Sequence, residues 1–410
     1  MYSAQSSRID LPILLTTRAI TTYFQPIISV GQHTVIGYEA LSRGIQPSTK
    51  DLIMPNDLFS LAAANNQLVE LDRLCREKAL ENYSLIAAGH NCALLFVNLD
   101  TAIIDNGVVG SGNLLGNVKR FNLSPTSIVI EIIESKVCDI QALKTFIRTY
   151  KNLGFLIALD DVGNGHSNLD RIFHVRPDII KIDRWLISEI DQDYYKQELF
   201  KALVHMAKKT GSLVVAEGIE TQSEALACLE FGADMLQGYY FSKPKPGPDT
   251  HFHYCSDKIN HVAAVFKNHK FEKISSACRQ KKDYCQVLQT ILIELGKNTP
   301  DQFETTLQAI VTKLPLMQYI YVLNMAGIQI TDTIEAPGIT STQNSGIFQA
   351  ARKGTDQSQK DYCMFIQADL DQYITETYIS LANGKPCVTY SMTFKDCTNS
   401  QYILCADFTP

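Results

Sequence analysis

Short runs of apolar residues alternate with longer amphipathic stretches between Tyr23 and Ser242. Several runs are continuously apolar, which is typical of parallel strands buried on both faces of a sheet. We predict strands at Tyr23–Val30, Ala93–Leu99, Ser127–Ile133, Phe155–Asp160, Ile179–Ile182, Leu213–Ala216 and Met235–Phe241.

The amphipathic stretches between these runs predict helices, because their apolar residues recur at helical spacing. Pro55 suits the first turn of a helix, and glycines follow the last turn of the other stretches. The predicted helices run from Pro55 to Leu80, Ser135 to Asn152, Tyr194 to Thr210 and Gln222 to Phe231. Strands and helices that alternate over about 230 residues favour an α/β fold, a (β/α)8 barrel, although the pattern alone also allows an open sheet.

A segment rich in proline and glycine, Ser242–Pro248, ends this pattern and predicts a domain boundary. The charged stretch His261–Leu295 then predicts a connecting helix. We expect four parts: an N-terminal leader at residues 1–17, the barrel at 18–250, a helical linker at 251–297 and a smaller domain at 298–410.

The smaller domain follows a different pattern. Asn383-Gly384 is a strong signal for a two-residue hairpin turn. Antiparallel hairpins beside short helices indicate an α+β domain. We predict helices at Phe303–Leu314 and Gly346–Gly354, and strands at Gln318–Asn324, Ile328–Thr333, Tyr373–Ala382, Pro386–Phe394 and Tyr402–Phe408.

Charge and cysteine content narrow the class of protein. The net charge of -6 argues against binding of a nucleic-acid polymer, which depends on clustered Lys and Arg. The eleven cysteines are scattered without a CxxC pair, as in a reduced cytoplasmic protein. No apolar run is long enough for a transmembrane helix, and the start of the chain does not have the pattern of a signal peptide, so we expect no membrane association.

Polar residues stand where the predicted strands end, and most of them are acids. In a barrel the C-terminal ends of the strands converge on one face. Carboxylates gathered there repel one another unless they are protonated or neutralised by cations. Oxygen ligands with one amide and no thiolate suit Mg²⁺ or Mn²⁺, and two such ions support phosphoryl transfer. The residues are Glu39, Asn98, Asp100, Glu131, Glu134, Asp160, Asp161, Lys181, Asp183, Glu217, Glu220 and Gln237.

Each of these residues also has an ordinary structural interpretation. A single acid after a strand is usually a helix N-cap or a turn residue, and Asp161 or Glu134 alone could be one. Lys181 could be a partner for one acid inside the barrel. The repetition from strand to strand favours a metal site over these alternatives.

With these motifs the chain resembles the EAL-domain cyclic di-GMP phosphodiesterases. The resemblance covers about 230 of the 410 residues, and its ordered set of motifs is specific to this family. The motifs are Phe24-Gln25-Pro26-Ile27, Glu39-Ala40-Leu41 with Arg43, Asn98, Glu131 with Glu134, Asp160-Asp161-Val162-Gly163-Asn164-Gly165, Lys181-Ile182-Asp183, Ala216-Glu217-Gly218-Ile219-Glu220 and Gln237-Gly238-Tyr239.

The resemblance implies a modified TIM barrel that hydrolyses one phosphodiester bond of cyclic di-GMP to give linear 5'-pGpG, with two Mg²⁺ or Mn²⁺ ions in each active site. The implied metal ligands are Glu39, Asn98, Glu131, Asp160 and Asp161. Lys181 would orient or deprotonate the attacking water, Glu217 would support the metal site, and Glu134 would brace the loop after Asp161. Gln25, Arg43, Asp183 and Gln237 would lie on the substrate side.

The resemblance also implies a homodimer. The smaller domain is similar in element order to PAS-like or Cache-like sensor domains that accompany such enzymes, and it would serve either for dimerisation or for sensing an unknown small molecule. Some residues depart from the family pattern: Asp100, Ile133, Val162, Asn164 and His166. The altered loop from Val162 to His166 leaves the alternative of a cyclic di-GMP receptor that signals through protein contacts without catalysis. A separate alternative is a protein-interaction adaptor in which the barrel has lost nucleotide binding.

Overall fold

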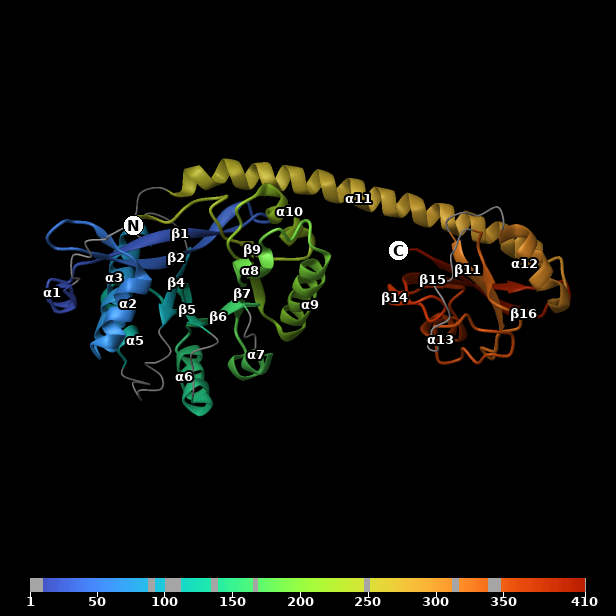
Figure 1. Ribbon diagram of the computed structural model, residues 1–410, viewed down its shortest axis with the longest axis horizontal. Coiled ribbons are helices and arrows are strands. Elements are labelled where there is room, and N and C mark those ends of the chain that lie inside the picture. Colours follow the sequence, from blue (N-terminus) through green and yellow to red (C-terminus); the bar gives the residue numbers. More distant parts are fainter. Residues whose placement is uncertain are drawn as a thin grey trace, which may run out of the picture. The chain divides into compact units, whose positions relative to one another are not determined.

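The computed structural model describes residues 10–87, 93–99, 112–133, 139–164, 169–246, 251–311, 317–337 and 348–409 (Figure 1). The chain divides into two units, Met1–Glu272 and Lys273–Pro410. The division falls within α11 (His251–Leu295), a single long helix. Within the described residues, no helix is both long enough and apolar enough to cross a membrane.

Eight of the strands described in the N-terminal unit close into a barrel, which confirms the predicted α/β barrel fold. Seven of them are parallel in the order β2, β4, β5, β6, β7, β8, β9. The first strand, β1, runs antiparallel to both β2 and β9 and closes the ring between them. The strands are β1 (Ile20–Ser29), β2 (Thr34–Ile45), β4 (Leu94–Leu99), β5 (Ile128–Ile133), β6 (Leu156–Val162), β7 (Ile179–Ile182), β8 (Leu213–Ala216) and β9 (Met235–Leu236), with short additions at β3 (Leu52–Ile53) and β10 (Lys245–Pro246).

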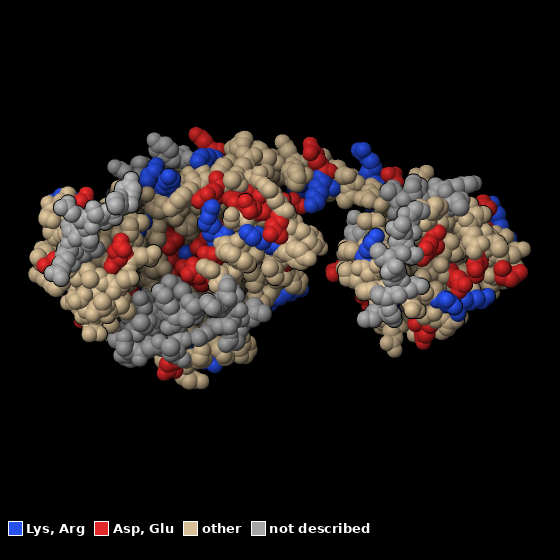
Figure 2. Space-filling view, viewed as in Figure 1, with Lys and Arg blue, Asp and Glu red and all other residues tan. Residues whose placement is uncertain are grey.

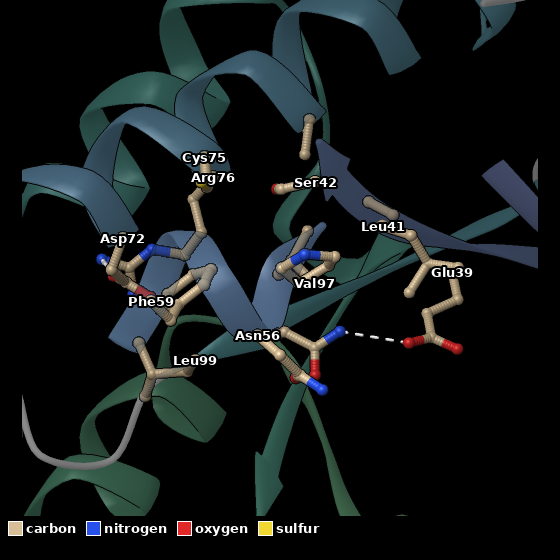
Figure 3. A pocket seen from close by; sticks show the side chains of 14 residues that line it. Glu39, Leu41, Ser42, Asn56, Phe59, Asp72, Cys75, Arg76, Val97 and Leu99 are labelled. Atoms are coloured by element: carbon tan, nitrogen blue, oxygen red, sulfur yellow. Dashed lines mark hydrogen bonds and ion pairs between the residues drawn. The ribbon is translucent and has the colours of Figure 1, made fainter. Parts of the chain in front are cut away.

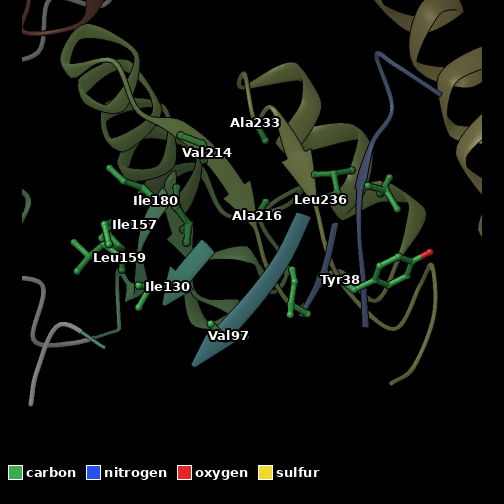
Figure 4. Close-up of a cluster of buried hydrophobic side chains, with 14 of the residues drawn as sticks. Tyr38, Val97, Ile130, Ile157, Leu159, Ile180, Val214, Ala216, Ala233 and Leu236 are labelled. Atoms are coloured by element: carbon green, nitrogen blue, oxygen red, sulfur yellow. The ribbon is translucent and has the colours of Figure 1, made fainter. Parts of the chain in front are cut away.

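Helices cover the outside of the barrel (Figure 1). Figure 4 shows part of the apolar layer behind them, in which Val97, Ile130 and Leu159 extend from neighbouring strands. The helices are α1 (Leu11–Thr16), α2 (Pro55–Ala64), α3 (Leu68–Ala87), α5 (Asn113–Arg120), α6 (Ile140–Asn152), α7 (Leu169–Val175), α8 (Arg184–Ile187), α9 (Tyr194–Thr210) and α10 (Gln222–Glu230), with a 3-10 turn at Pro125–Ser127.

The inside of the barrel holds a second apolar layer, because side chains alternate between the two faces of each strand. Gly37 of β2 belongs to this layer: a Cβ atom there would lie 2.8 Å from the Leu94 carbonyl oxygen and 2.8 Å from the Phe96 ring. The other strands contribute Ile27, Phe96, Val129, Ala158, Ile179, Val215 and Met235.

Three local predictions for this unit were wrong. The stretch from Pro55 to Leu80 is two helices, α2 and α3, separated at Asn66, which has a left-handed backbone (φ 54°). The strand Met235–Phe241 ends after two residues, because Gly238 turns the chain so closely against Ile219 that a Cβ would lie 2.1 Å from its carbonyl oxygen. The strand β2 was not among the predicted strands. The helix α9 has the predicted bounds and ends at Gly211 in the left-handed region (φ 82°).

The C-terminal unit has a sheet with helices on both faces, in agreement with the predicted α+β architecture. Adjacent strands in the order β12, β11, β16, β15, β13 are antiparallel, and β14 pairs with β15. Residues of α11 and α12 pack on one face, and α13 packs on the other. The elements are α12 (Phe303–Val311), β11 (Met317–Asn324), β12 (Ile334–Glu335), α13 (Asp361–Gln367), β13 (Gln372–Ile374), β14 (Tyr378–Ile379), β15 (Pro386–Lys395) and β16 (Gln401–Phe408), with a 3-10 turn at Pro300–Gln302 before α12. A PAS-like or Cache-like fold stays a prediction.

Local predictions in this unit were partly wrong. Residues 348–354 are not helical, while α13 was not predicted. Ile379 pairs with Pro386, so Asn383-Gly384 lies in a longer loop instead of forming a two-residue turn. The strand Tyr373–Ala382 is broken into β13 and β14. The predicted strand Ile328–Thr333 is reduced to isolated bridges at Ile328 and Gln329. The described cysteines are free and most are buried, in agreement with reduced thiols.

We predict that Gly37→Ala destabilises the barrel by roughly 1–3 kcal/mol, because the added methyl group meets a backbone carbonyl and a core ring that are both closely packed. Denaturant unfolding of the full chain measures this change. Gly31→Ala is the control, since a Cβ there has no atom within 4 Å. Equal stability of the two variants would show that the contact at Gly37 relaxes without cost.

Candidate active site

A ring of polar side chains lies inside the barrel, next to the inner apolar layer and two residues away from it along each strand. Moving two residues along a strand returns a side chain to the same face, so each apolar interior residue has a polar neighbour on that face. In β1 the step runs the opposite way along the chain, because this strand is antiparallel. The ring consists of Gln25, Glu39, Asn98, Glu131, Asp160, Lys181, Glu217 and Gln237. Acidic side chains gather in a hollow on this unit (Figure 2).

The expected position at strand ends was wrong for Glu39, which lies in the middle of β2. Glu131 is likewise inside β5, not at its end. Glu39 remains in the ring because β2 continues beyond the barrel to pair with β3, and because Glu39 is directly opposite Gln25 across the β1–β2 pairing. Glu131 remains in the ring because it is directly opposite Asn98 across the β4–β5 pairing. Shared register, not the strand end, brings these residues together.

Lys181 occupies the centre of the ring and is 1% exposed. Its Nζ lies 2.5 Å from Glu131 Oε1 and 2.6 Å from Glu217 Oε1. It lies 3.3 Å from Asp160 Oδ1 and 3.5 Å from Glu39 Oε2. One ammonium group therefore lies within ion-pair distance of four carboxyl groups. The ring has an excess of negative charge when all four are ionised.

Burial and neighbouring charges shift the pKa values of the side chains in this cluster in different directions. Burial opposes the charge on Lys181, but the four carboxylates together raise its pKa well above the usual value. Burial and the neighbouring Glu39 raise the pKa of Glu131 well above its ordinary range. Burial also raises the pKa of Glu39, but Lys181 and hydrogen bonds from two amides outweigh it and lower that pKa overall. The cluster thus takes up protons to limit its negative charge.

Two amide side chains hold Glu39 in place. Asn98 Nδ2 donates to Glu39 Oε1 at 3.1 Å, and Gln237 Nε2 donates to Glu39 Oε2 at 2.6 Å. The Gln237 amide also lies 3.2 Å from Gln25 Oε1, and Gln25 in turn donates to the Ser242 carbonyl. The carboxylate of Glu39 therefore has a fixed orientation toward the centre of the ring.

A β-bulge interrupts the pairing of β6 at the pair Asp160-Asp161. The pairing of β6 with β7 shifts register between Leu159 and Val162, and both of these residues pack into the outer core. Two residues instead of one lie between them, and the extra residue, Asp161, has a left-handed backbone (φ 58°). Burial, followed by the charges of Asp160 and Asp183, raises the pKa of Asp161 to about 6. Asp161 is thus close enough to the ring to share its electrostatics.

The donor set of the ring fits a hard divalent cation. It consists of carboxylate and amide oxygens without sulfur or imidazole, the ligands preferred by Mg²⁺, Mn²⁺ and Ca²⁺. Glu131 Oε2 is buried without a hydrogen-bond partner, which is a costly state for a carboxylate oxygen that has no cation. Within the described residues, no three His, Cys, Asp or Glu side chains form a ready metal-ligand group. The acids are grouped around Lys181 instead, so a cation would have to share their oxygens with the ammonium.

The remaining predicted residues have different surroundings. Arg43 is 9% exposed, its guanidinium lies 5.5 Å from the centre of the Tyr23 ring, and it donates to the Ser42 carbonyl. Asp183 caps α8 by accepting from the Trp185 backbone N–H at 2.8 Å, the ordinary role of an acid after a strand. Glu134 lies outside the described residues.

A pocket of about 300 Å³ lies beside the ring and was not predicted. Figure 3 shows Glu39 on one side of it and the ion pair of Asp72 and Arg76 on the other, and Asn98 also lines the pocket. Both residues of this pair are buried. An Asp followed by an Arg four positions later, on the inner face of a predicted helix, was the available sequence signal.

The family comparison agrees with this geometry. The family model described as "EAL domain" matches residues 9–244. Among curated proteins, the cyclic di-GMP phosphodiesterase NbdA of Pseudomonas aeruginosa is 30% identical over 234 residues, which cover 55% of this chain and 29% of that protein. The chain therefore spans less than a third of the length of this relative.

Solved structures of EAL proteins have a similar fold. The Bacillus subtilis YkuI protein, solved with cyclic di-GMP and calcium, superposes with a TM-score of 0.80 over 98% of this chain and 99% of its own, at 23% identity. This likeness concerns the fold. Klebsiella pneumoniae BlrP1, in complex with manganese and cyclic di-GMP, has a TM-score of 0.51 at 25% identity, and the match covers 56% of each chain. Because the EAL model accounts for more than half of the residues, this chain belongs to the EAL domain family.

Proposed function

We propose that the barrel hydrolyses cyclic di-GMP to linear 5'-pGpG in a reaction that depends on divalent cations. The observation that carries the proposal is the buried ring of acids around Lys181, which has the donor set of a cation site. Relatives support the substrate, since NbdA is named a cyclic di-GMP phosphodiesterase and BlrP1 was solved with this nucleotide.

Glu39, Asn98, Glu131, Asp160 and Asp161 would hold two Mg²⁺ or Mn²⁺ ions. Such ions, when bound, polarise a phosphoryl oxygen and lower the pKa of water. The amides of Asn98 and Gln237 keep Glu39 oriented, and the bulge in β6 places Asp161 next to Asp160. Glu217 would steady the site through its contact with Lys181 at 2.6 Å.

Lys181 would orient the attacking water rather than deprotonate it. Burial works against its charge, but the surrounding carboxylates raise its pKa, so this ammonium group keeps its proton and acts as a donor. Water oxygen bonds to phosphorus, the bond from phosphorus to the 3' oxygen of one ribose breaks, and that oxygen takes a proton. The product keeps its phosphate on the 5' side, as in 5'-pGpG.

Gln25 and Arg43 would contact the nucleotide, with Gln237 behind them. Gln25 is on β1 and Arg43 is on β2, and these two strands are the antiparallel pair at one side of the ring. A guanidinium pairs well with a phosphate because its donors are planar and forked. Since the chain has a net charge of -6, a local cationic group of this kind is needed to attract an anionic substrate.

The alternative of a receptor without catalysis is based on the altered loop that begins at Val162. Val162 packs into the outer core and is 1% exposed, so this replacement changes packing behind the site. The charge of Asp161 still interacts with those of Asp160, Lys181 and Glu39, which favours hydrolysis. Regulation by the C-terminal unit and a homodimer stay predictions.

We expect Glu39→Gln to lower the rate of hydrolysis at least about 100-fold, because it removes a charged ligand while keeping the shape of the side chain. Chromatography of pGpG formed with Mg²⁺ or Mn²⁺ measures the rate. Glu81→Gln, which changes an exposed ion pair with Lys78, should leave the rate unchanged.

Undiminished turnover by Glu39→Gln would contradict the assignment of this residue. Nucleotide binding without any pGpG from the unaltered protein, under either metal, would support the receptor instead.

We also expect Lys181→Met to lower the free energy of unfolding by about 3 kcal/mol in the presence of a chelator, since it leaves buried carboxylates without their cation. Adding Mn²⁺ should recover part of this loss, because the metal neutralises the same acids. Thermal melting with and without Mn²⁺ measures both effects. Lys201→Met is the control, because that lysine pairs with Glu198 on the surface. Equal melting temperatures for the two variants under chelation would rule out the role of Lys181 as internal counter-ion.

A further inference from the structure

The sheet of the C-terminal unit carries an acid at a position that belongs to its apolar face. Along β16, Leu404 and Phe408 pack into the cluster on one face, while Ile403 and Cys405 pack into the cluster on the other. Strand alternation places Asp407 on the second face, two residues after Cys405. Asp407 is only 4% exposed. A carboxylate is rarely buried in this way unless a partner compensates its charge.

The partners of Asp407 in the structure are neutral. Thr389 Oγ1 donates to Asp407 Oδ1 at 2.7 Å. Tyr378 Oη lies 2.6 Å from the same hydroxyl, and since the Thr389 proton is directed to Asp407, Tyr378 is the donor. Among the described residues, no Lys, Arg or His forms an ion pair with Asp407. Burial raises the pKa of Asp407 to about 6 against the lowering effect of Thr389, so the carboxyl group is largely ionised at neutral pH.

Asp407 lines a cavity of about 560 Å³, within the size range of small-molecule sites. Tyr321, Tyr362 and Tyr378 line the same cavity, from β11, α13 and β14, which are labelled in Figure 1. The segments 349–352 and 355–357 and the residue Lys360 form another part of its wall. Two of these residues, Arg352 and Lys360, are cationic, but Arg352 is exposed and Lys360 is half-buried, whereas Asp407 is buried. An unpaired, buried carboxylate therefore adjoins a space that is large enough for a ligand and rich in aromatic rings.

These surroundings select an organic cation over a metal ion. A hard divalent ion needs six or more oxygen ligands, whereas Asp407 is the buried carboxylate among the described lining residues and the other acid, Asp356, is exposed. Aromatic faces attract ammonium groups, and a carboxylate beside them adds a charge-assisted hydrogen bond. We propose that the C-terminal unit binds a small organic ammonium compound in this cavity, with the charged nitrogen at Asp407.

A matched pair of fluorinated probes tests this site in the full chain. At neutral pH, 4-fluorobenzylamine carries an ammonium group, whereas 4-fluorobenzyl alcohol has nearly the same size and no charge. Fluorine NMR titrations give the dissociation constant of each. We expect the amine to bind at least about tenfold more tightly than the alcohol, as a hydrogen bond to a charged partner predicts.

Single substitutions test whether the amine binds at Asp407. Asp407→Asn keeps the size of the side chain and should weaken amine binding at least about tenfold. Asp371→Asn changes an exposed acid in the same unit and should have no effect. Glu39→Gln should also have no effect, which separates this cavity from the acids in the barrel.

Equal binding of amine and alcohol, or no binding of either in the millimolar range, would overturn the proposal. That comparison uses the unaltered protein and holds even if Asp407→Asn fails to fold. Unchanged amine affinity in a folded Asp407→Asn variant would also overturn it, because the charge at this position would then have no part in binding.

Discussion

The buried ammonium group of Lys181 makes the acidic end of the barrel possible. Two carboxylates about 5 Å apart repel each other by about 3 kcal/mol at an effective dielectric constant of 20. Strand alternation brings four such groups to one level of the barrel, and Lys181 contacts each of them. The attraction between Lys181 and the carboxylates offsets part of their mutual repulsion. The negative charge that Lys181 does not balance can be neutralised by a bound cation. This excess of negative charge destabilises the fold, and the same excess creates affinity for cations.

One sequence pattern predicts both the barrel and most of this ring. Continuous apolar runs identify buried parallel strands, and the polar residue that interrupts or ends each run marks the site. Asn98, Lys181 and Glu217 could be assigned in this way. Glu39 was assigned to the site but placed at a strand end, because the strand around it includes Gly37 and polar residues and lacks the continuous apolar pattern.

Other features depend on contacts that a local pattern does not contain. The left-handed backbone of Asp161 accompanies a register shift between β6 and β7, and predicting such a shift requires knowledge of both strands at once. The break at Asn66 and the early end of β9 at Gly238 depend on backbone geometry against neighbouring elements. In the C-terminal unit, the short helix α13 has too few turns for a clear periodic signal.

The antiparallel strand β1 has a consequence for how the barrel is made. Its pairing with β2 is a hairpin between neighbours in the chain, whereas its pairing with β9 joins Ile28 to Leu236, near the end of the barrel sequence. Such long-range pairing costs loop entropy and slows folding. During synthesis, the β1–β2 hairpin can form early but presents an unpaired edge until β9 and β10 leave the ribosome. Closure of the ring, and with it the complete set of eight polar residues, is therefore a late event that couples the assembly of the site to completion of the whole barrel.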